Sequence, residues 1–166
     1  MARHSGLPAL EIGTEVYYFR GMSDSDILPE LTIGGKKCIL IEMPPAPWPD
    51  TVFEELEQIR RRRGIIPIVA HIDRYISPFR THGIPQRLED LPVLVQANAE
   101  FFLERRTAHM ALKMLKNGTI HLLGSDCHDL SHRKPNLGPA LQHIVRKLGP
   151  DALERIRNHG NHIFEY

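Results

Sequence analysis

Strand-like and helix-like segments alternate along this chain, and the alternation limits what it can fold into. Apolar runs typical of buried strands occupy residues 9–18, 37–42, 65–70, 93–97 and 119–124. Helical patterns cover residues 50–63, 99–116, 139–148 and 151–158, with shorter helices expected over residues 23–31 and just before residue 93. Strands separated by long helices pair in parallel through right-handed crossovers. The sequence therefore predicts an α/β fold with about five parallel strands, either a (β/α) barrel or an open doubly wound sheet.

Bulk composition favours one globular domain over residues 1–166 and gives no sign of nucleic-acid or membrane binding. Of the 166 residues, 42% are hydrophobic, which is enough for a core. Lys and Arg total 21 against 20 Asp and Glu, so no global field attracts nucleic acid or a membrane. No apolar run approaches the roughly 20 residues that a bilayer span needs. Cys38 and Cys127 lie far apart in a chain without a secretory signal, so we expect reduced thiols in a cytoplasmic protein.

The segment 50–63 carries the clearest local boundary signals. Asp50 is expected to cap the helix and Gly64 to end it. Arg60–Arg63 fall in the last turn, where cations oppose the negative end of the helix dipole. We interpret them as a solvated helix end, with a nucleic-acid patch as the alternative.

Polar side chains with metal-binding chemistry recur where the predicted strands end. They are Glu15, Glu42, His71, Asn98, Asp126 and His128. Because the carboxyl ends of parallel strands share one rim, we expect these groups to converge. Carboxylates and imidazoles together suit divalent Mn, Fe or Zn. No glycine-rich phosphate loop follows any strand, so a nucleotide-binding sheet lacks support.

Five segments resemble, in order and spacing, motifs of the polymerase-and-histidinol-phosphatase (PHP) superfamily, in particular its capsule-type bacterial tyrosine phosphatases. They are residues 13–18 (GTEVYY), 40–44 (LIEMP), 68–75 (IVAHIDRY), 96–98 (QAN) and 124–129 (GSDCHD). Two positions depart from the pattern: Asp73 stands where the family often has Glu, and Asp129 where it often has Asn. Neither position is expected to be a primary metal ligand.

The resemblance implies a distorted (β/α) barrel of about seven strands with metal ions at its rim. Matched by motif, the metal ligands would be Glu15, Glu42, His71 and Asp126, with His128 on a further ion. Arg74 and Arg133 would grip the phosphate, although each also fits an ordinary salt bridge. Asn98 and Asp73 would support the ligands. Manganese is the expected metal, with iron or zinc as alternatives.

The activity that this resemblance implies is hydrolysis of phosphotyrosine in a protein substrate, expected to be a bacterial tyrosine autokinase that controls capsule or exopolysaccharide assembly. Within the superfamily, a histidinol-phosphatase-like activity is the alternative. The family opens with a strand carrying D-x-H-x-H, and this chain contains no H-x-H. Its residues 1–6 would be the tail of a helix, and it would correspond to the carboxyl-terminal part of the family's barrel.

Two consequences of that difference are expected. Five strands cannot close such a barrel, so we expect a second copy or partner to cover the open side. The chain could also fold and bind a metal or partner without turning over substrate.

Cys127 to Arg133 also satisfy C-x5-R, the signature of cysteine-dependent phosphatases. In those enzymes a thiolate attacks phosphorus while backbone amides hold the dianion. Asp129 would place a carboxylate where the phosphate must lie, and no glycine supplies a tight nest of amides. This remains the less favoured interpretation.

Overall fold

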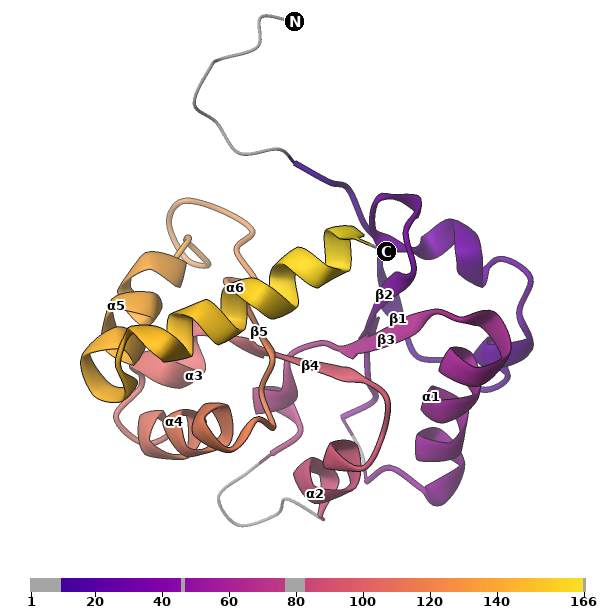
Figure 1. Ribbon diagram of the computed structural model, residues 1–166, viewed down its shortest axis with the longest axis horizontal. Coiled ribbons are helices and arrows are strands. Elements are labelled where there is room, and N and C mark those ends of the chain that lie inside the picture. The colour runs from indigo at the N-terminus through magenta and orange to yellow at the C-terminus, as the bar shows by residue number, and fades with distance from the viewer. Residues whose placement is uncertain (1–9, 46, 77–82, 166) are drawn as a thin grey trace, which may run out of the picture.

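The computed structural model describes residues 10–45, 47–76 and 83–165 and contains a five-stranded parallel sheet (Figure 1). Its strands are β1 (Glu15–Tyr17), β2 (Cys38–Glu42), β3 (Ile66–Val69), β4 (Leu94–Asn98) and β5 (Leu122–Gly124). Their order in the sheet is their order in the chain, and every neighbouring pair is parallel. The predicted parallel α/β fold is confirmed. Sequential order lacks the reversal that defines a doubly wound sheet.

Six α-helices accompany the strands in the described part of the chain. They are α1 (Asp50–Arg63), α2 (Ile84–Glu89), α3 (Ala99–Leu103), α4 (Ala108–Asn117), α5 (Leu137–Leu148) and α6 (Pro150–Glu165). Four short 3-10 helices are η1 (Met22–Asp24), η2 (Leu28–Leu31), η3 (Ile33–Gly35) and η4 (Ile72–Arg74). The helix expected over residues 23–31 is therefore two 3-10 turns. β1 is shorter than predicted, and the expected start at Ala9, like residues 1–6, lies outside the described residues.

The prediction of a single long helix over residues 99–116 is wrong, because the structure has two helices there, α3 and α4. The chain leaves the helix at Glu104, whose ψ of 131° is extended, and a new helix begins at Ala108. Thr107 Oγ1 donates to the carbonyl of Phe101 at 2.9 Å, which supports the corner. α6, with 16 residues, is instead the longest helix in the described chain.

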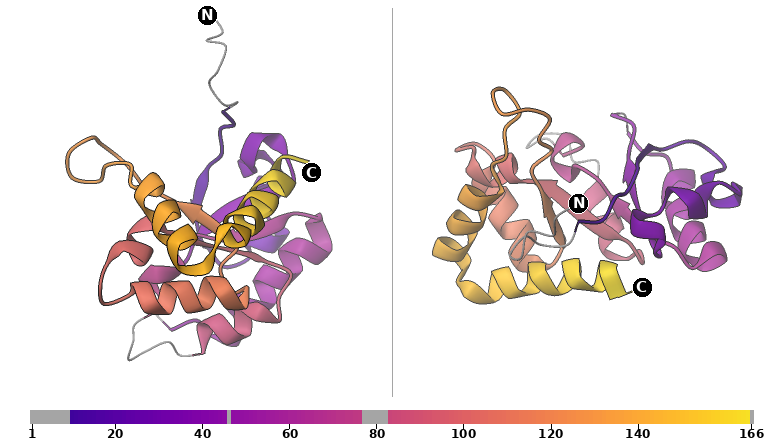
Figure 2. Two further views of the ribbon diagram at one scale, coloured as in Figure 1. Left: turned by 60° about the vertical axis from the view of Figure 1, so that its left-hand side comes forward. Right: turned by 90° about the horizontal axis from the view of Figure 1, so that it is seen from above.

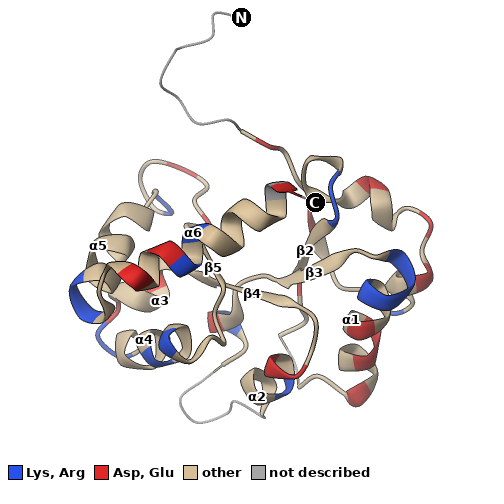
Figure 3. Cartoon of the chain, viewed as in Figure 1, with Lys and Arg blue, Asp and Glu red and all other residues tan. Residues whose placement is uncertain are grey.

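α1 begins and ends as its sequence signals indicate, except at its cap. The N-cap position is Pro49, which makes no side-chain capping hydrogen bond, and Asp50 is the first helical residue. The Asp50 carboxylate pairs with Arg87 at 2.8 Å. Gly64 closes the helix with a φ of 67°, a conformation that glycine adopts without strain. Arg60–Arg63 form the basic end of α1 (Figure 3), and each contacts an acceptor in this chain. These contacts support the structural interpretation of the four arginines.

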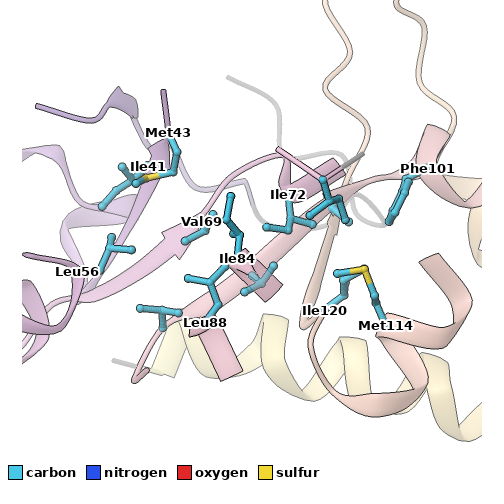
Figure 4. Close-up of a cluster of buried hydrophobic side chains, with 14 of the residues drawn as sticks. Ile41, Met43, Leu56, Val69, Ile72, Ile84, Leu88, Phe101, Met114 and Ile120 are labelled. Atoms are coloured by element: carbon cyan, nitrogen blue, oxygen red, sulfur yellow. The ribbon is translucent and has the colours of Figure 1, made fainter. Parts of the chain in front are cut away.

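One face of the sheet is buried under helices and forms the main core. Ile41 and Val69 on the strands belong to the same buried cluster as Leu56 of α1, Leu88 of α2 and Met114 of α4 (Figure 4). Side chains of this size, fully buried, each stabilise the fold by about 1.5–3 kcal/mol. The alternation of residues along each strand decides which side chains face these helices.

The opposite face, called the inner face here, carries Cys38, Ile68 and Leu122 and is covered only in part. Ile163 near the end of α6 and Ile33 of η3 pack against it. Figure 2 shows α6 running along this side of the sheet. The candidate site described below lies on this inner face. Within the described residues, no helix is both long enough and apolar enough to cross a membrane.

Candidate metal and phosphate site

The strand register brings the predicted site residues to one edge of the sheet. Tyr17 pairs with Glu42, Ile41 with Val69, and Asn98 with Gly124, so the strands end side by side. Because side chains alternate along a strand, Glu42 and Asn98 fall on the inner face together with Gln96 and Glu15. β2 and β4 thus carry apolar side chains along the inner face and a polar residue, Glu42 or Asn98, at the carboxyl end.

His71 is the centre of this arrangement. Its side chain is 4% exposed, and its backbone is left-handed with a φ of 51°. The His71 N–H donates to Gln96 Oε1 at 2.7 Å, which helps to hold this conformation. In the ring, Nδ1 lies 2.9 Å from Asn98 Oδ1, and Nε2 lies 2.8 Å from Glu15 Oε1.

Both nitrogens of the His71 ring face an acceptor. Asn98 presents its oxygen to Nδ1, because its Nδ2 donates to Asp73 Oδ2 at 3.2 Å. A neutral imidazole carries one N–H and can donate to only one of two acceptors. With Nδ1–H directed at Asn98, the lone pair of Nε2 faces the Glu15 carboxylate. This donor pair fits a divalent metal, with Nδ1 held by the amide behind it.

Asp73, Asn98 and Gln96 form the support behind His71. Asp73 Oδ1 accepts the backbone N–H of Asn98 at 2.8 Å, and Gln96 Nε2 donates to Asn98 Oδ1 at 3.3 Å. The sequence motifs predict a supporting role for Asn98 and Asp73, but none for Gln96. The signal was present, since Gln96 lies two residues before Asn98 and a strand repeats every two residues.

Arg74 forms hydrogen bonds with two of the predicted metal ligands, Glu42 and Asp126. Its NH1 donates to Glu42 Oε1 at 2.5 Å and its NH2 to Asp126 Oδ2 at 2.6 Å. Burial alone would lower the pKa of Arg74, but the charges of Asp126 and Glu42 outweigh it and raise that pKa. The guanidinium is a fixed cation between two carboxylates.

Asp126 is the second residue with a left-handed backbone. With a φ of 50°, it and His71 are the non-glycine residues in the described ranges that have positive φ. Conformations of this kind are costly and concentrate at functional sites. Arg133 also donates through NH2 to Asp126 Oδ2. His128 lies beside this pair, with Nδ1 3.0 Å from the Asp126 carbonyl oxygen and Nε2 3.3 Å from Arg133 NH1.

The predicted ligands thus lie near one another but do not form one cluster. Glu15, His71, Gln96 and Asp126 all line a cavity of about 370 Å³ at the inner face. Glu42 is tied to Asp126 through Arg74. Over residues 10–45, 47–76 and 83–165, however, no three His, Cys, Asp or Glu side chains are close enough together to hold a metal ion.

The loop from Cys127 to Arg133 is organised around Asp129. One Asp129 oxygen, Oδ1, accepts the backbone N–H groups of Ser131 and His132, each at 2.6 Å. Those bonds and the Ser131 hydroxyl lower the pKa of Asp129 to about 2. The amides that a cysteine-dependent phosphatase would direct at phosphate are directed at this carboxylate, which argues against that interpretation.

Comparison with known proteins gives a consistent family. Residues 3–163 match the family model described as capsular polysaccharide synthesis, CpsB/CapC. The tyrosine-protein phosphatase CpsB of Streptococcus agalactiae serotype III (strain NEM316) is 27% identical over 154 residues, covering 87% of this chain and 63% of the relative. CpsB of Streptococcus pneumoniae is 30% identical over 94 residues, covering 52% of this chain and 39% of the relative.

A solved structure agrees in fold. It belongs to a study of YwqE from Bacillus subtilis and CpsB from Streptococcus pneumoniae, described as unique metal-dependent tyrosine phosphatases. It superposes with a TM-score of 0.71 at 20% identity and covers 88% of this chain and 64% of that chain. The present chain therefore spans less than two thirds of the length of these proteins. The resemblance inferred from the five motifs is confirmed, and the chain belongs to the CpsB/CapC capsular polysaccharide synthesis family.

Proposed function

We propose that this chain is a metal-dependent phosphomonoester hydrolase that acts on phosphotyrosine in proteins. The observation that carries the proposal is His71, held with one ring nitrogen on Asn98 and the other on Glu15. This pair lies on a cavity that also reaches Asp126, where two guanidinium groups meet. The groups that we propose as metal ligands and as phosphate-binding residues thus lie at one edge of the sheet.

In the proposed reaction each residue has a separate task. Glu15 and His71 would hold a divalent cation, with manganese preferred and iron or zinc as alternatives, while Glu42, Asp126 and His128 would complete or extend the site. When bound, such a cation neutralises phosphoryl charge and makes hydroxide available near neutral pH. Arg74 and Arg133 would hold phosphoryl oxygens as charge shifts in the transition state. A tyrosine leaving group, with a phenol pKa near 10, departs with less acid assistance than an alkyl alcohol.

The substrate and setting that we propose rest on the family. The matched relatives are named tyrosine-protein phosphatases, and the family model is one of capsular polysaccharide synthesis. We therefore propose a bacterial tyrosine autokinase of capsule or exopolysaccharide assembly as the substrate. Cys38 and Cys127 are both free thiols, which supports action in the reducing cytoplasm.

The fold around the site is proposed to be an arc of a PHP-type barrel formed by residues 1–166 as one domain. Sequential parallel strands are the arrangement of a barrel wall. Because the inner face is only partly covered, we propose that a second copy or another protein closes the open side.

A second candidate function is binding without turnover. The observation that favours it is the lack of a three-residue metal cluster in the described ranges. Under this alternative the chain binds a metal or a partner through the same edge but hydrolyses nothing.

Hydrolysis of p-nitrophenyl phosphate with added Mn²⁺ tests the proposal. We expect turnover that a chelator abolishes, that Glu15→Gln and His71→Ala each lower by at least about 100-fold, and that Cys127→Ser leaves unchanged. Thiol alkylation should have no effect. Metal binding without turnover would select the second candidate, and a dead Cys127→Ser variant that folds normally would select the cysteine mechanism.

A further inference from the structure

Asp126 accepts from two arginines through the same carboxylate oxygen. Its Oδ2 receives Arg74 NH2 at 2.6 Å and also contacts Arg133 NH2. The second arm of Arg74 donates to Glu42 Oε1 at 2.5 Å. The two proposed phosphate-binding residues are therefore bonded to two of the proposed metal ligands.

These contacts and metal coordination use the same two carboxylates. A cation bound to either oxygen of Asp126 or Glu42 brings a second positive charge next to the guanidinium groups. A carboxylate oxygen offers about two lone-pair positions, and both positions of Asp126 Oδ2 are used by guanidinium groups. A cation that coordinates this oxygen must displace at least one of them. Asp126 is 12% exposed, so water does little to supply a substitute partner.

A displaced guanidinium needs another anion. Arg74 and Arg133 are 37% and 45% exposed, and neither group can lose its charge. An unpaired, partly buried cation is costly, and a planar guanidinium fork matches the oxygens of a tetrahedral dianion. In a phosphatase, the phosphoryl group of the substrate can serve as this anion.

We propose that Arg74 and Arg133 act as exchangeable counter-ions, paired with Glu42 and Asp126 until a metal ion takes those carboxylates and releases the arginines for phosphate. This inference rests on the proposed metal and phosphate site. It adds that the metal binds first and thereby frees Arg74 and Arg133 to bind phosphate. By linkage, a tetrahedral dianion must tighten metal binding by the same factor as the metal tightens dianion binding. A coupling of at least about fivefold is expected.

Calorimetric titration of Mn²⁺ into the full chain measures this coupling without any assay of activity. The titration is run in sulfate and in chloride at matched ionic strength, with correction for Mn²⁺ bound by sulfate. The native chain should bind Mn²⁺ at least about fivefold more tightly in sulfate. Arg74→Gln should bind Mn²⁺ more tightly than the native chain in chloride, because a competitor for Asp126 is removed, and should lose most of the sulfate effect.

Arg157→Gln is the matched control. Arg157 pairs with Glu154 on the exposed surface of α6, so the variant makes the same charge change away from the site and should behave like the native chain. Saturable Mn²⁺ binding with equal affinity in both anions, unchanged by Arg74→Gln, would overturn the counter-ion exchange and leave the proposed metal site intact. No saturable Mn²⁺ binding to any of these folded proteins would overturn both.

Discussion

The side chains of His71 and Glu15 meet with 2.8 Å between Nε2 and Oε1, although 56 residues separate them in the chain. The contact exists because β1 and β3 are parallel strands on either side of β2. Glu15 begins β1 on the inner face, and His71 follows the carboxyl end of β3. Glu15 is 38% exposed at the side chain, whereas His71 is almost fully buried. A buried imidazole that faces a half-exposed carboxylate is accessible to a cation from one side only.

Replacing Gln96 with leucine should loosen His71. The variant removes the acceptor of the buried His71 N–H, so we expect a loss of about 1–3 kcal/mol in the free energy of unfolding and a 10- to 100-fold loss of metal affinity. Urea unfolding and Mn²⁺ titration measure the two effects. Gln86→Leu, on the exposed side of α2, is the control and should change neither. Unchanged metal affinity in a folded Gln96→Leu protein would remove Gln96 from the support of His71.

Gly124→Ala tests the packing next to that support. A methyl group at position 124 would lie 2.6 Å from Gln96 Nε2, and the Gln96 amide is fixed by bonds to Ala97 and Asn98. Overpacking of this kind costs about 1–3 kcal/mol and should also weaken metal binding. Gly138→Ala in α5, where nothing lies within 4 Å, should instead stabilise the fold by about 0.5–1 kcal/mol. Equal thermal stability of the two variants would contradict the close approach of Gly124 to Gln96.

Tyr18→Phe should destabilise the strand that carries Glu15. The Tyr18 hydroxyl donates to the buried carboxylate of Glu55 at 2.7 Å, and burial together with that carboxylate raises the pKa of Tyr18. Loss of the donor leaves Glu55 with the weaker bonds from Ser23, at a cost of about 1–3 kcal/mol in chemical denaturation. Tyr17→Phe is the neighbouring control, because Tyr17 is 56% exposed. A similar small effect of both substitutions would refute the anchoring role of Tyr18.

Stability should fall as the pH drops from about 6.5 to about 4, in part because of His121. Burial first, and then the charge of His159, lower the pKa of His121 from 6.5 to about 4. The unfolded chain binds this proton at a higher pH than the folded chain, so the stabilisation is complete above pH 6.5 and is lost as the pH falls through 4. Allowing for partial solvent screening, the effect is on the order of 1 kcal/mol.

His121→Gln isolates this contribution. Glutamine can still accept the Val95 N–H that His121 Nδ1 accepts at 3.1 Å. The slope of unfolding free energy between pH 4 and pH 6.5 should become smaller in His121→Gln than in the native chain. His109→Gln, on the exposed side of α4, should keep the native slope. An unchanged slope in His121→Gln would assign the pH dependence to other groups.

Much of the fold could be predicted because strand and helix periodicity are local. Residues 38–42 and 66–69 are short apolar runs, and the structure has strands at both. The break at Glu104 could not be predicted in this way. Residues 104–107 contain no Gly or Pro, and Glu and Arg are good helix formers, so local propensity favours a continuous helix. Packing of Phe101 and Phe102 into the core turns the chain instead.

The site shows the same limit. Strand-end positions predict that Glu42, His71 and Asp126 share an edge, and they do. The pairing of Arg74 with two carboxylates depends on side-chain positions from three strand ends, which no spacing in the sequence encodes. Glu55 was likewise unforeseen, because a buried carboxylate on α1 is explained only by the Tyr18 hydroxyl from another element.

Anomalous X-ray scattering at the manganese edge can locate the divalent cation that we propose His71 and Glu15 hold. Crystals of the full chain grown with Mn²⁺ should show an anomalous peak within coordination distance of His71 Nε2 and the Glu15 carboxylate. Glu15→Gln crystals, grown in the same way, should lose it. A map with no peak there, or with peaks only at exposed pairs such as His162 and Glu165, would show that His71 and Glu15 do not hold the metal.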